Sequence, residues 1–404
     1  MSKAGEIYQF GSFLLDVPER RLLRDGVEIP LAHKVFFTLR LLLENAGRLL
    51  TREQLLERVW PDVTVEEGNL NHVISILRKT LGEQAGGEAY IETLPRLGYR
   101  FVAPVSELDA APGRQTTGGV TGPRARQEIR FCITSDQVSI AYAKAGAGYP
   151  LVKAANWLNH LDFEWDSPVW RHWLCELGKH HTFIRYDERG NGLSDWDIKD
   201  GSFEAWVHDL EAVVDAAGVE RFALMGISQG GPVAVAYAVR HPERVSHLIL
   251  FGAYSRGRNN REQPDDEVAA RRALKTLMRF DWGRSNPAFS QLFTSRFLPE
   301  NATPEHQRWF NDLQRMSATG ENAAWIMDEC DNTDVRSLLS SVSVPTMVFH
   351  SERDQVVPIE EGRMLAAGIP NAKFVSLPSA NHLLLEEEPA WRKFLAELGE
   401  FLGW

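Results

Sequence analysis

Three residues of the types that carry out nucleophilic catalysis stand in the second half of this 404-residue chain. The first is Ser228, in the sequence GISQGG, which follows an apolar run at 222–225 and precedes a helical pattern at 232–240. A serine flanked by glycines at a strand-to-helix turn can be held in a strained and accessible conformation that suits a nucleophile. The sequence around Ser228 therefore predicts a nucleophilic turn rather than a chance match.

An acid and a base follow Ser228 along the chain. Asp354 comes after a predicted strand at 346–350, and His382 comes after a predicted strand at 373–377. A histidine can take the proton of a serine hydroxyl, while an aspartate fixes the imidazole tautomer and stabilises its charged form. Either residue alone is more often a helix cap or a surface histidine. Because each of the three follows its own predicted strand, we predict that they form a Ser-His-Asp triad.

The elements that must position these residues alternate between strand and helix from residue 129 onward. An antiparallel pair of strands is predicted at 129–133 and 138–142. This alternation predicts a mostly parallel sheet covered by helices on both faces. The further apolar runs, most of them separated by helical patterns, lie at 151–152, 182–186, 222–225, 247–251, 346–350 and 373–377.

Residues 129–404 resemble the α/β-hydrolase superfamily. The resemblance rests on the GISQGG turn, on YDERGNGLS at 186–194, which is similar to the DxRGxGxS turn of that family, and on VPTMVFHSERDQVVP at 344–358. It implies an α/β-hydrolase fold in which the three residues above are nucleophile, acid and base. A serine nucleophile argues against dehalogenase or epoxide hydrolase chemistry, for which similar folds use an aspartate.

The same resemblance implies an oxyanion hole made of two backbone N–H groups. The first belongs to Gln229, the residue after the nucleophile, and the second is expected in the loop after an early strand. In this loop Ala155-Asn156 replaces the His-Gly pair that is common in the family, so the second N–H is expected from Trp157. Serine hydrolase activity with a reduced turnover rate would be a natural consequence.

An insertion at 255–336 precedes the acid-bearing strand and resembles the helical cap that covers the pocket in this superfamily. Aromatic residues on helices often only pack the core, and a pocket lining is the alternative. On the second interpretation, apolar or aromatic ligands are favoured. The expected pocket residues are then Asn156, Trp282, Trp309 and Trp325.

The first 105 residues follow a different pattern. Short strands predicted at 8–15 and 21–31 are followed by three helical patterns, the last at 67–81, and by a hairpin at 90–102. A small N-terminal sheet, three helices and a terminal hairpin make a winged helix of the α+β class.

The helix predicted at 67–81 has one apolar face and one polar face. Amide and guanidinium groups can form paired hydrogen bonds with base edges, and lysine can neutralise a phosphate. A merely solvated face is the alternative for any single helix of this kind. The residues of the polar face are Asn71, Ser75, Arg78 and Lys79.

Residues 6–104 resemble the OmpR/PhoB-type winged-helix family through NLNHVISILRKTLG and YIETLPRLGYRFVAPV. The resemblance implies that the helix at 67–81 enters the major groove of double-stranded DNA. It also implies that Thr93, Arg96 and Tyr99 of the hairpin contact the DNA backbone or the minor groove.

The segment at 106–128 is rich in Gly, Pro, Ala and Thr, which predicts a flexible linker between a domain at 1–105 and a domain at 129–404. The net charge of the chain is −11, but residues 1–105 hold 13 Lys and Arg against 14 Asp and Glu, so most of the acidity belongs to the second domain. Charge alone therefore does not indicate a nucleic-acid partner.

The three cysteines are widely spaced, which predicts neither a disulfide framework nor a cysteine metal site, and we expect no metal and no cofactor. No apolar run is long enough to span a membrane, and the first residues lack a signal-peptide pattern. We therefore expect a cytoplasmic protein without a membrane partner.

Three functions remain open at this stage. The favoured one is a ligand-responsive transcription regulator whose hydrolase domain binds, with or without cleaving it, a small ester, lactone, other acyl compound or aromatic effector. The second is a genuine serine hydrolase, similar to an esterase or lactonase, that carries a DNA-binding tether. The third is a scaffold that dimerises winged helices, which a complete triad disfavours. A homodimer is expected because one winged helix reads only a short half-site.

Overall fold

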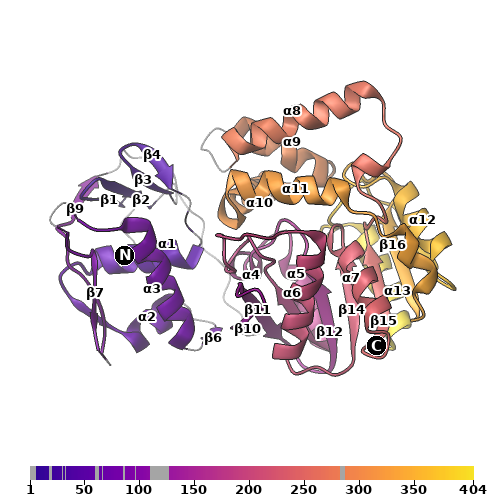
Figure 1. Cartoon of the computed structure of the whole chain (residues 1–404), viewed down its shortest axis with the longest axis horizontal. Coiled ribbons are helices and arrows are strands. Elements are labelled where there is room, and N and C mark those ends of the chain that lie inside the picture. The colour runs from indigo at the N-terminus through magenta and orange to yellow at the C-terminus, as the bar shows by residue number, and fades with distance from the viewer. Residues whose placement is uncertain are drawn as a thin grey trace. The chain divides into compact units, whose positions relative to one another are not determined.

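The computed structural model describes residues 6–404 apart from 18–20, 30, 32, 60–62, 66, 85–86, 96, 110–126 and 283–286. The chain forms two compact units, Met1–Arg130 and Phe131–Trp404. Figure 1 shows the first unit in indigo to purple and the second in magenta to yellow.

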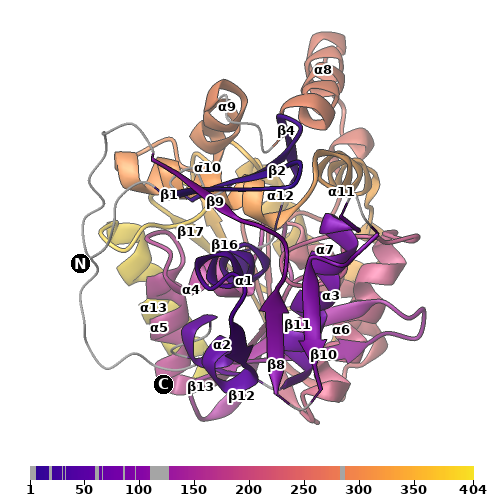
Figure 2. The same ribbon diagram turned by 90° about the vertical axis from the view of Figure 1, so that its left-hand side faces the viewer.

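The first unit combines two small antiparallel sheets with the helices α1, α2 and α3 (Figures 1 and 2). The larger sheet has the order β4-β3-β2-β1-β9, and the smaller one, β5-β8-β7, contains a hairpin in which Thr93 lies opposite Tyr99. This arrangement confirms the predicted winged helix. Its elements are β1 Glu6–Phe10, β2 Phe13–Asp16, β3 Arg21–Arg24, β4 Val27–Ile29, α1 His33–Glu44, β5 Leu49–Thr51, α2 Arg52–Val59, β6 Val63–Val65, α3 Glu67–Leu81, β7 Ile91–Leu94, β8 Gly98–Phe101 and β9 Ser106–Asp109.

Helix α3 joins the core of this unit through one face. Its apolar side chains recur every three or four residues and are buried, so the helix presents a single stripe to α1 and α2. The buried residues of α3 include Leu70, Ile74, Leu77 and Leu81.

The linker was predicted to begin at residue 106, and this position is wrong. Residues 106–109 form strand β9, which pairs antiparallel with β1 and places Glu107 opposite Tyr8. The sequence SELD lacks the apolar alternation of a half-buried strand, so the ladder with the edge of β1, rather than local preference, makes it a strand. The remainder of the linker up to residue 126 lies outside the described residues.

The second unit is built on a sheet with the strand order β17-β16-β15-β14-β12-β13-β11-β10. Strands β11 and β13 are antiparallel, whereas the ladders from β13 across to β17 are parallel. This agrees with the predicted mostly parallel sheet. The strands are β10 Gln127–Ile133, β11 Ser139–Ala145, β12 Tyr149–Ala154, β13 His181–Tyr186, β14 Phe222–Ile227, β15 Val245–Phe251, β16 Thr346–Ser351 and β17 Lys373–Leu377.

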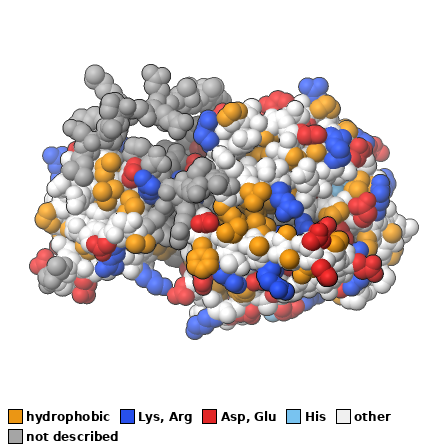
Figure 3. Space-filling view, turned by 90° about the horizontal axis from the view of Figure 1, so that it is seen from above, with side chains coloured by type: hydrophobic (Ala, Val, Ile, Leu, Met, Phe, Trp, Pro, Cys, Tyr) orange, Lys and Arg blue, Asp and Glu red, His pale blue; other side chains and the backbone are white. Residues whose placement is uncertain are grey.

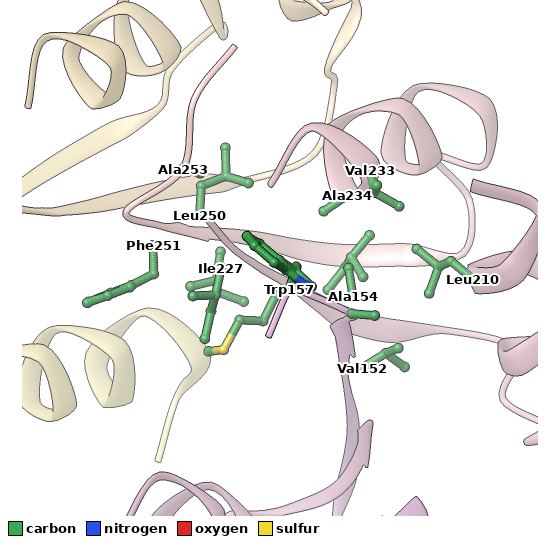
Figure 4. Close-up of a cluster of buried hydrophobic side chains, with 14 of the residues drawn as sticks. Val152, Ala154, Trp157, Leu210, Ile227, Val233, Ala234, Leu250, Phe251 and Ala253 are labelled. Carbon is green, nitrogen blue, oxygen red and sulfur yellow. The ribbon is translucent and has the colours of Figure 1, made fainter. Parts of the chain in front are cut away.

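Helices cover both faces of this sheet because its central strands are apolar on both sides. Phe251 packs on Trp173 of α5 and Phe394 of α13, with ring centroids 5.1 and 5.5 Å away. The preceding residue, Leu250, points to the opposite face, toward Gly231 of α7. Figure 4 shows side chains of β12, β14, β15, α6 and α7 gathered in this core. The helices are α4 Leu161–Trp165, α5 Arg171–His180, α6 Phe203–Ala216, α7 Gly230–Arg240, α12 Ile359–Gly368 and α13 Pro389–Leu402.

A helical insertion between β15 and β16 forms the predicted cap. Figures 1 and 2 both show its helices together on one side of the second unit. The insertion consists of η1 Arg258–Asn260, α8 Asp265–Asp281, α9 Pro287–Phe297, α10 Pro304–Ser317, α11 Gly320–Asn332 and η2 Arg336–Ser341.

The outer face of the cap carries exposed apolar side chains. Leu277 and Phe280 of α8 are 45% and 63% exposed, and Leu292 of α9 is 54% exposed. Figure 3 looks down on this side of the molecule and shows hydrophobic side chains gathered beside Lys and Arg.

Candidate active site and DNA-binding face

Ser228 occupies a sharp turn between β14 and α7, as the sequence predicts. Its φ is +51°, in the left-handed region that a non-glycine residue adopts only at a cost. The turn is tight enough to require small neighbours: a Cβ at Gly226 would lie 2.7 Å from the carbonyl oxygen of Gly230, and one at Gly231 would collide with Ala253. The glycines of GISQGG therefore allow the backbone to form the tight turn that carries the serine.

Asp354 and His382 form a short, buried pair. Nδ1 of His382 lies 2.6 Å from Oδ2 of Asp354, and the other carboxylate oxygen accepts the N–H groups of Val356 at 2.8 Å and Val357 at 3.0 Å. These two backbone donors fix the carboxylate, so it can hold the imidazole with its Nε2 directed away from the acid. Nε2 of His382 is buried and has no hydrogen-bond partner among the described residues.

The fold brings this pair to the nucleophile. The backbone N–H of Ser228 donates to the carbonyl oxygen of Phe251 at 2.9 Å. The next residue, Gly252, lies against the pair, since a Cβ there would be 3.2 Å from Cε1 of His382 and 3.6 Å from Oδ2 of Asp354. No hydrogen bond joins Ser228 Oγ to the imidazole in the described part of the chain, and such bonds often form fully only when substrate is bound.

The predicted second oxyanion donor is already engaged within the protein. The N–H of Trp157 donates to Oε1 of Gln229 at 3.0 Å, and Nε2 of Gln229 donates to Oε2 of Glu188 at 3.0 Å. Burial raises the pKa of Glu188 to about 8. Trp157 is thus in the predicted loop, but its N–H is not free to meet a developing oxyanion while the Gln229 amide stays in place.

A cavity of about 90 Å³ opens at Ser228 beneath the cap. The predicted pocket residues are corrected, because none of Asn156, Trp282, Trp309 and Trp325 is among the described residues that line it. Trp282 stacks on Trp157 from behind, and Trp309 stacks on Phe163. The cavity is lined by Trp157, Ser228, Gln229, Tyr254, Gly257, Arg258, Arg261, Arg271, Leu274, Phe293, Arg296, Phe297, Met327, Cys330, Asp331, Gln355, Val356 and Val357.

In the first unit, the outer face of α3 is tied to the hairpin. Arg78 is exposed and donates to the carbonyl oxygen of Ile91 at 2.9 Å and to Oγ1 of Thr93 at 2.6 Å. Arg78 is therefore bound to β7 in the absence of DNA. Ser75 and Lys79 are exposed on the same helix.

Tyr99 lies beneath this face rather than on it. The residue is 3% exposed, and its hydroxyl donates to Oδ1 of Asn71 at 2.7 Å. Arg52 donates to the same oxygen at 3.0 Å, and its guanidinium lies 5.5 Å from the centroid of the Tyr99 ring. The predicted direct contact of Tyr99 with DNA is therefore replaced by a positioning contact with Asn71. Arg96, the other predicted wing contact, lies outside the described residues.

Comparison with known proteins agrees with both units. Residues 159–389 match the family model described as alpha/beta hydrolase fold. The chain belongs to this alpha/beta hydrolase family. Residues 26–101 match the model described as transcriptional regulatory protein, C terminal, so the first unit is a winged helix of the OmpR/PhoB type.

Several relatives align with the second unit over nearly their whole length. The AB hydrolase superfamily protein YisY of Bacillus subtilis is 26% identical over 63% of this chain and 92% of that protein. The 2-hydroxymuconate semialdehyde hydrolase of Pseudomonas sp. is 28% identical over 70% of this chain and 97% of that protein. The crystal structure of a hydrolase from Pseudomonas aeruginosa PA01 is 26% identical, covers 68% of this chain and 98% of that one, and has a TM-score of 0.57.

The motif YDERGNGLS of this alpha/beta hydrolase domain serves the scaffold. Asp187 accepts the N–H of Leu161 at 2.9 Å and of Leu193 at 2.8 Å, which closes the turn. Arg189 forms a buried ion pair with Asp209 at 2.6 Å. The bonds of Asp187 and Arg189 hold loops beside the site, and neither residue lines the cavity among its described residues.

Two kinds of site residue are missing from the sequence prediction. Glu188, which holds the Gln229 amide, has no local signal because its partner is distant in sequence. The arginines of the cavity wall do have a local signal in the sequence, since Arg256, Arg258 and Arg261 cluster at the start of the predicted cap.

No group of three or more His, Cys, Asp or Glu side chains is arranged to hold a metal ion in the described part of the chain. None of the described helices is both long and apolar enough to cross a membrane.

Proposed function

We propose that this protein is a DNA-binding transcription regulator whose hydrolase domain binds, and slowly hydrolyses, a small ester, lactone or other acyl compound. The observation that carries the proposal is the Asp354–His382 pair beside a strained Ser228 that opens onto a cavity under the cap. The relatives named hydrolases support a hydrolytic role, and the winged helix supports a double-stranded DNA partner.

The reaction follows from the geometry. His382 removes the hydroxyl proton as Ser228 Oγ attacks the acyl carbon, and Asp354 stabilises the resulting imidazolium. The leaving alkoxide takes that proton, which leaves an acyl-serine. Water, deprotonated by the same imidazole, then attacks the acyl carbon, so the acid is released and Ser228 regains its proton.

The engaged N–H group of Trp157 supports a sensor rather than an efficient enzyme. Loss of one oxyanion donor lowers the rate of acyl transfer by about 10² to 10³. A regulator can use a slow reaction to end its own signal, whereas a metabolic hydrolase needs fast turnover. The Gln229 contact with Trp157 therefore favours the regulator over a genuine hydrolase with a DNA tether.

We also propose that the protein acts as a homodimer. Two winged helices are needed to read a two-part operator, and the exposed Leu277 and Phe280 of the cap offer an apolar surface for a second copy. Sedimentation of the full chain over a range of concentrations measures this, and a monomer at all concentrations contradicts it.

The nucleophile is tested by labelling with a fluorophosphonate probe. We expect the wild-type chain to be labelled and Ser228→Ala to remain unlabelled, because only a serine activated by His382 reacts readily with such a phosphorus centre. Ser376→Ala, which removes a half-buried serine of the edge strand β17, is the matched control and keeps the label. Absence of labelling in a folded wild-type chain would leave a binding role only.

A further inference from the structure

The cavity at Ser228 has one strongly cationic wall. Arg258, Arg261, Arg271 and Arg296 line it together, and Asp331 is the acidic residue among its described lining. These arginines come from η1, the segment after it, α8 and α9, so the cap supplies the charge. An apolar ester alone has no need of such a wall.

Two of the four guanidinium groups are neutralised inside the protein. Arg271 forms a two-pronged ion pair with Asp331, with both N–O distances 2.9 Å. Arg261 lies 3.3 Å from the buried carboxylate of Glu361. Lys275 also forms an ion pair with Asp331, at 2.8 Å. The carboxylate of Asp331 therefore already has two cationic partners and does not neutralise a third.

The other two arginines, Arg258 and Arg296, form no ion pair with a carboxylate among the described residues. Arg258 is half-buried, and its Nη2 donates to the carbonyl oxygen of Val356 at 3.0 Å. A guanidinium has five N–H donors, so Arg258 retains several for a ligand. Burial, together with the nearby Arg271 and Arg261, lowers the pKa of Arg258 to about 10. Arg296 is exposed at the rim of the same cavity.

The remaining wall is apolar with one unused hydroxyl. Trp157, Phe293 and Phe297 face the cavity between the serine and the cap. The hydroxyl of Tyr254 is buried in a residue 5% exposed and has no oxygen or nitrogen partner within the described chain, although the thiol of Cys330 lies close to it. The nearby thiol of Cys330 is at most a weak acceptor. A buried polar group left in this way is normally satisfied by a ligand or by water.

We propose that Arg258 and Arg296 form a carboxylate subsite, so that the effector is an ester or lactone that carries a second, free carboxylate. The planar fork of a guanidinium matches a carboxylate, and the apolar wall would hold the carbon chain that separates this group from the acyl carbon at Ser228. The inference rests on the proposed function, because it takes Ser228 as the point that receives the acyl group.

The test compares two ligands of nearly equal shape on the full-length Ser228→Ala chain. Calorimetric titration is done with 4-phenylbutyrate, which is anionic, and with 4-phenylbutyramide, which is neutral. We expect the carboxylate to bind about tenfold more tightly or better, because hydrogen bonds to a charged group are the stronger ones. Arg258→Gln should abolish the preference, and Arg258→Lys should restore part of it by returning the charge without the fork.

Two further variants keep the test decisive. Arg296→Gln changes an exposed side chain and should reduce the preference even if Arg258→Gln fails to fold. Arg272→Gln removes a charge from the same cap but outside the described cavity lining, and should leave the preference unchanged. Equal affinity for acid and amide, or binding of neither at millimolar concentration, would overturn the subsite.

The two proposals fail in different ways. Intact fluorophosphonate labelling without a charge preference overturns the carboxylate subsite alone. A charge preference in a chain that the fluorophosphonate does not label supports the subsite and overturns the hydrolytic part of the proposed function.

Discussion

The side chain of Gln229 decides how the nucleophile can be used. Its Oε1 accepts the N–H of Trp157, and its Nε2 is held by buried Glu188. Acyl transfer is accelerated by donors that already point at the position where negative charge develops. Here one such donor points at an amide oxygen instead, and we therefore propose that the electrostatic part of catalysis by Ser228 is weakened.

Gln229→Met should raise the rate of hydrolysis of p-nitrophenyl butyrate by up to about 100-fold. Methionine has the length of glutamine but no comparable acceptor, so the Trp157 N–H becomes available to the oxyanion. Steady-state release of nitrophenol measures the rate. Gln355→Met, which alters another glutamine of the cavity lining, serves as the control. A rate at or below that of the wild-type chain would show that Gln229 does not obstruct the oxyanion hole.

Glu188 makes the stability of the protein depend on pH, and this dependence can be measured separately from catalysis. Burial raises its pKa from 4.5 to about 8, so the folded chain retains a proton that the unfolded chain releases at lower pH. Between about pH 5 and pH 8 folding takes up this proton, and the stability contributed by Glu188 falls as the pH rises. Above both pKa values the contribution no longer changes.

Glu188→Gln removes the titration and keeps an acceptor for the Gln229 amide. The melting temperature of the variant, minus that of the wild-type chain, should therefore increase from pH 5 to pH 8 in thermal unfolding experiments. Glu386→Gln changes an exposed carboxylate and should leave the difference flat. Parallel curves for wild type and Glu188→Gln would mean that the folded carboxyl is already ionised at pH 5.

Chain order and glycine spacing were sufficient to predict that Ser228, Asp354 and His382 lie together, because each of them follows a strand that an apolar run reveals. The same reasoning could not predict the Gln229 contact. Whether a glutamine turns toward Trp157 or toward the cavity depends on a bond to Glu188, 41 residues away. That bond exists only once β13 and β14 are parts of one sheet.

At the scale of elements, α3 and the hairpin form one continuous surface. Arg78 ties the helix to β7, and Tyr99 of β8 binds Asn71 of α3. Because Oδ1 of Asn71 already accepts bonds from Tyr99 and Arg52, we propose that its amide nitrogen is the group that meets DNA. Such an amide offers donors, which suit acceptors such as N7 and O6 of guanine.

Tyr99→Phe should weaken DNA binding several-fold while the domain stays folded. The apolar ring keeps its place in the core, but Asn71 loses one of the two bonds that orient it, at a cost of about 0.5 to 1.5 kcal/mol. Fluorescence anisotropy at fixed salt, with a duplex selected from a random pool, measures the affinity. Tyr90→Phe alters another buried tyrosine of this domain and should bind as the wild type does. Unchanged affinity of Tyr99→Phe would remove Asn71 from the interface.

Elements with a strong periodicity of apolar residues could be predicted from the sequence, whereas elements that depend on pairing or packing with distant segments could not. The helix expected at 67–81 is α3, Glu67–Leu81, because four apolar residues mark its buried face. Strand β9 was missed since its four residues are held by the edge of β1. In the cap, aromatic residues lie on several sides of the helices, so composition could not tell that Phe293 faces the cavity while Trp282 and Trp309 do not.

At the scale of the molecule, one chain combines a DNA-binding face with a small-molecule site. A ligand changes DNA affinity only if it binds two arrangements of the protein unequally, and the effect must then be reciprocal. Typical couplings of about 1 to 3 kcal/mol correspond to changes of about 5-fold to 150-fold in affinity.

Titration of the Ser228→Ala chain with 4-phenylbutyrate, with and without the selected duplex, measures this coupling. We expect the two affinities for the ligand to differ by at least about 5-fold, and the ligand to change the affinity for DNA by the same factor. The alanine variant prevents cleavage from disturbing the equilibrium. Equal affinities, with binding intact at both sites, would favour the enzyme with a DNA tether over the regulator.

The backbone conformation of Ser228 affects which substitutions are expected at this position during evolution. Its φ of +51° suits glycine better than serine, so replacement by glycine would gain about 1 kcal/mol of stability. Gly226 and Gly231 are constrained by close packing whether or not any ester is cleaved. In a descendant line that no longer uses the hydroxyl, mutation would therefore erase the serine and spare the glycines.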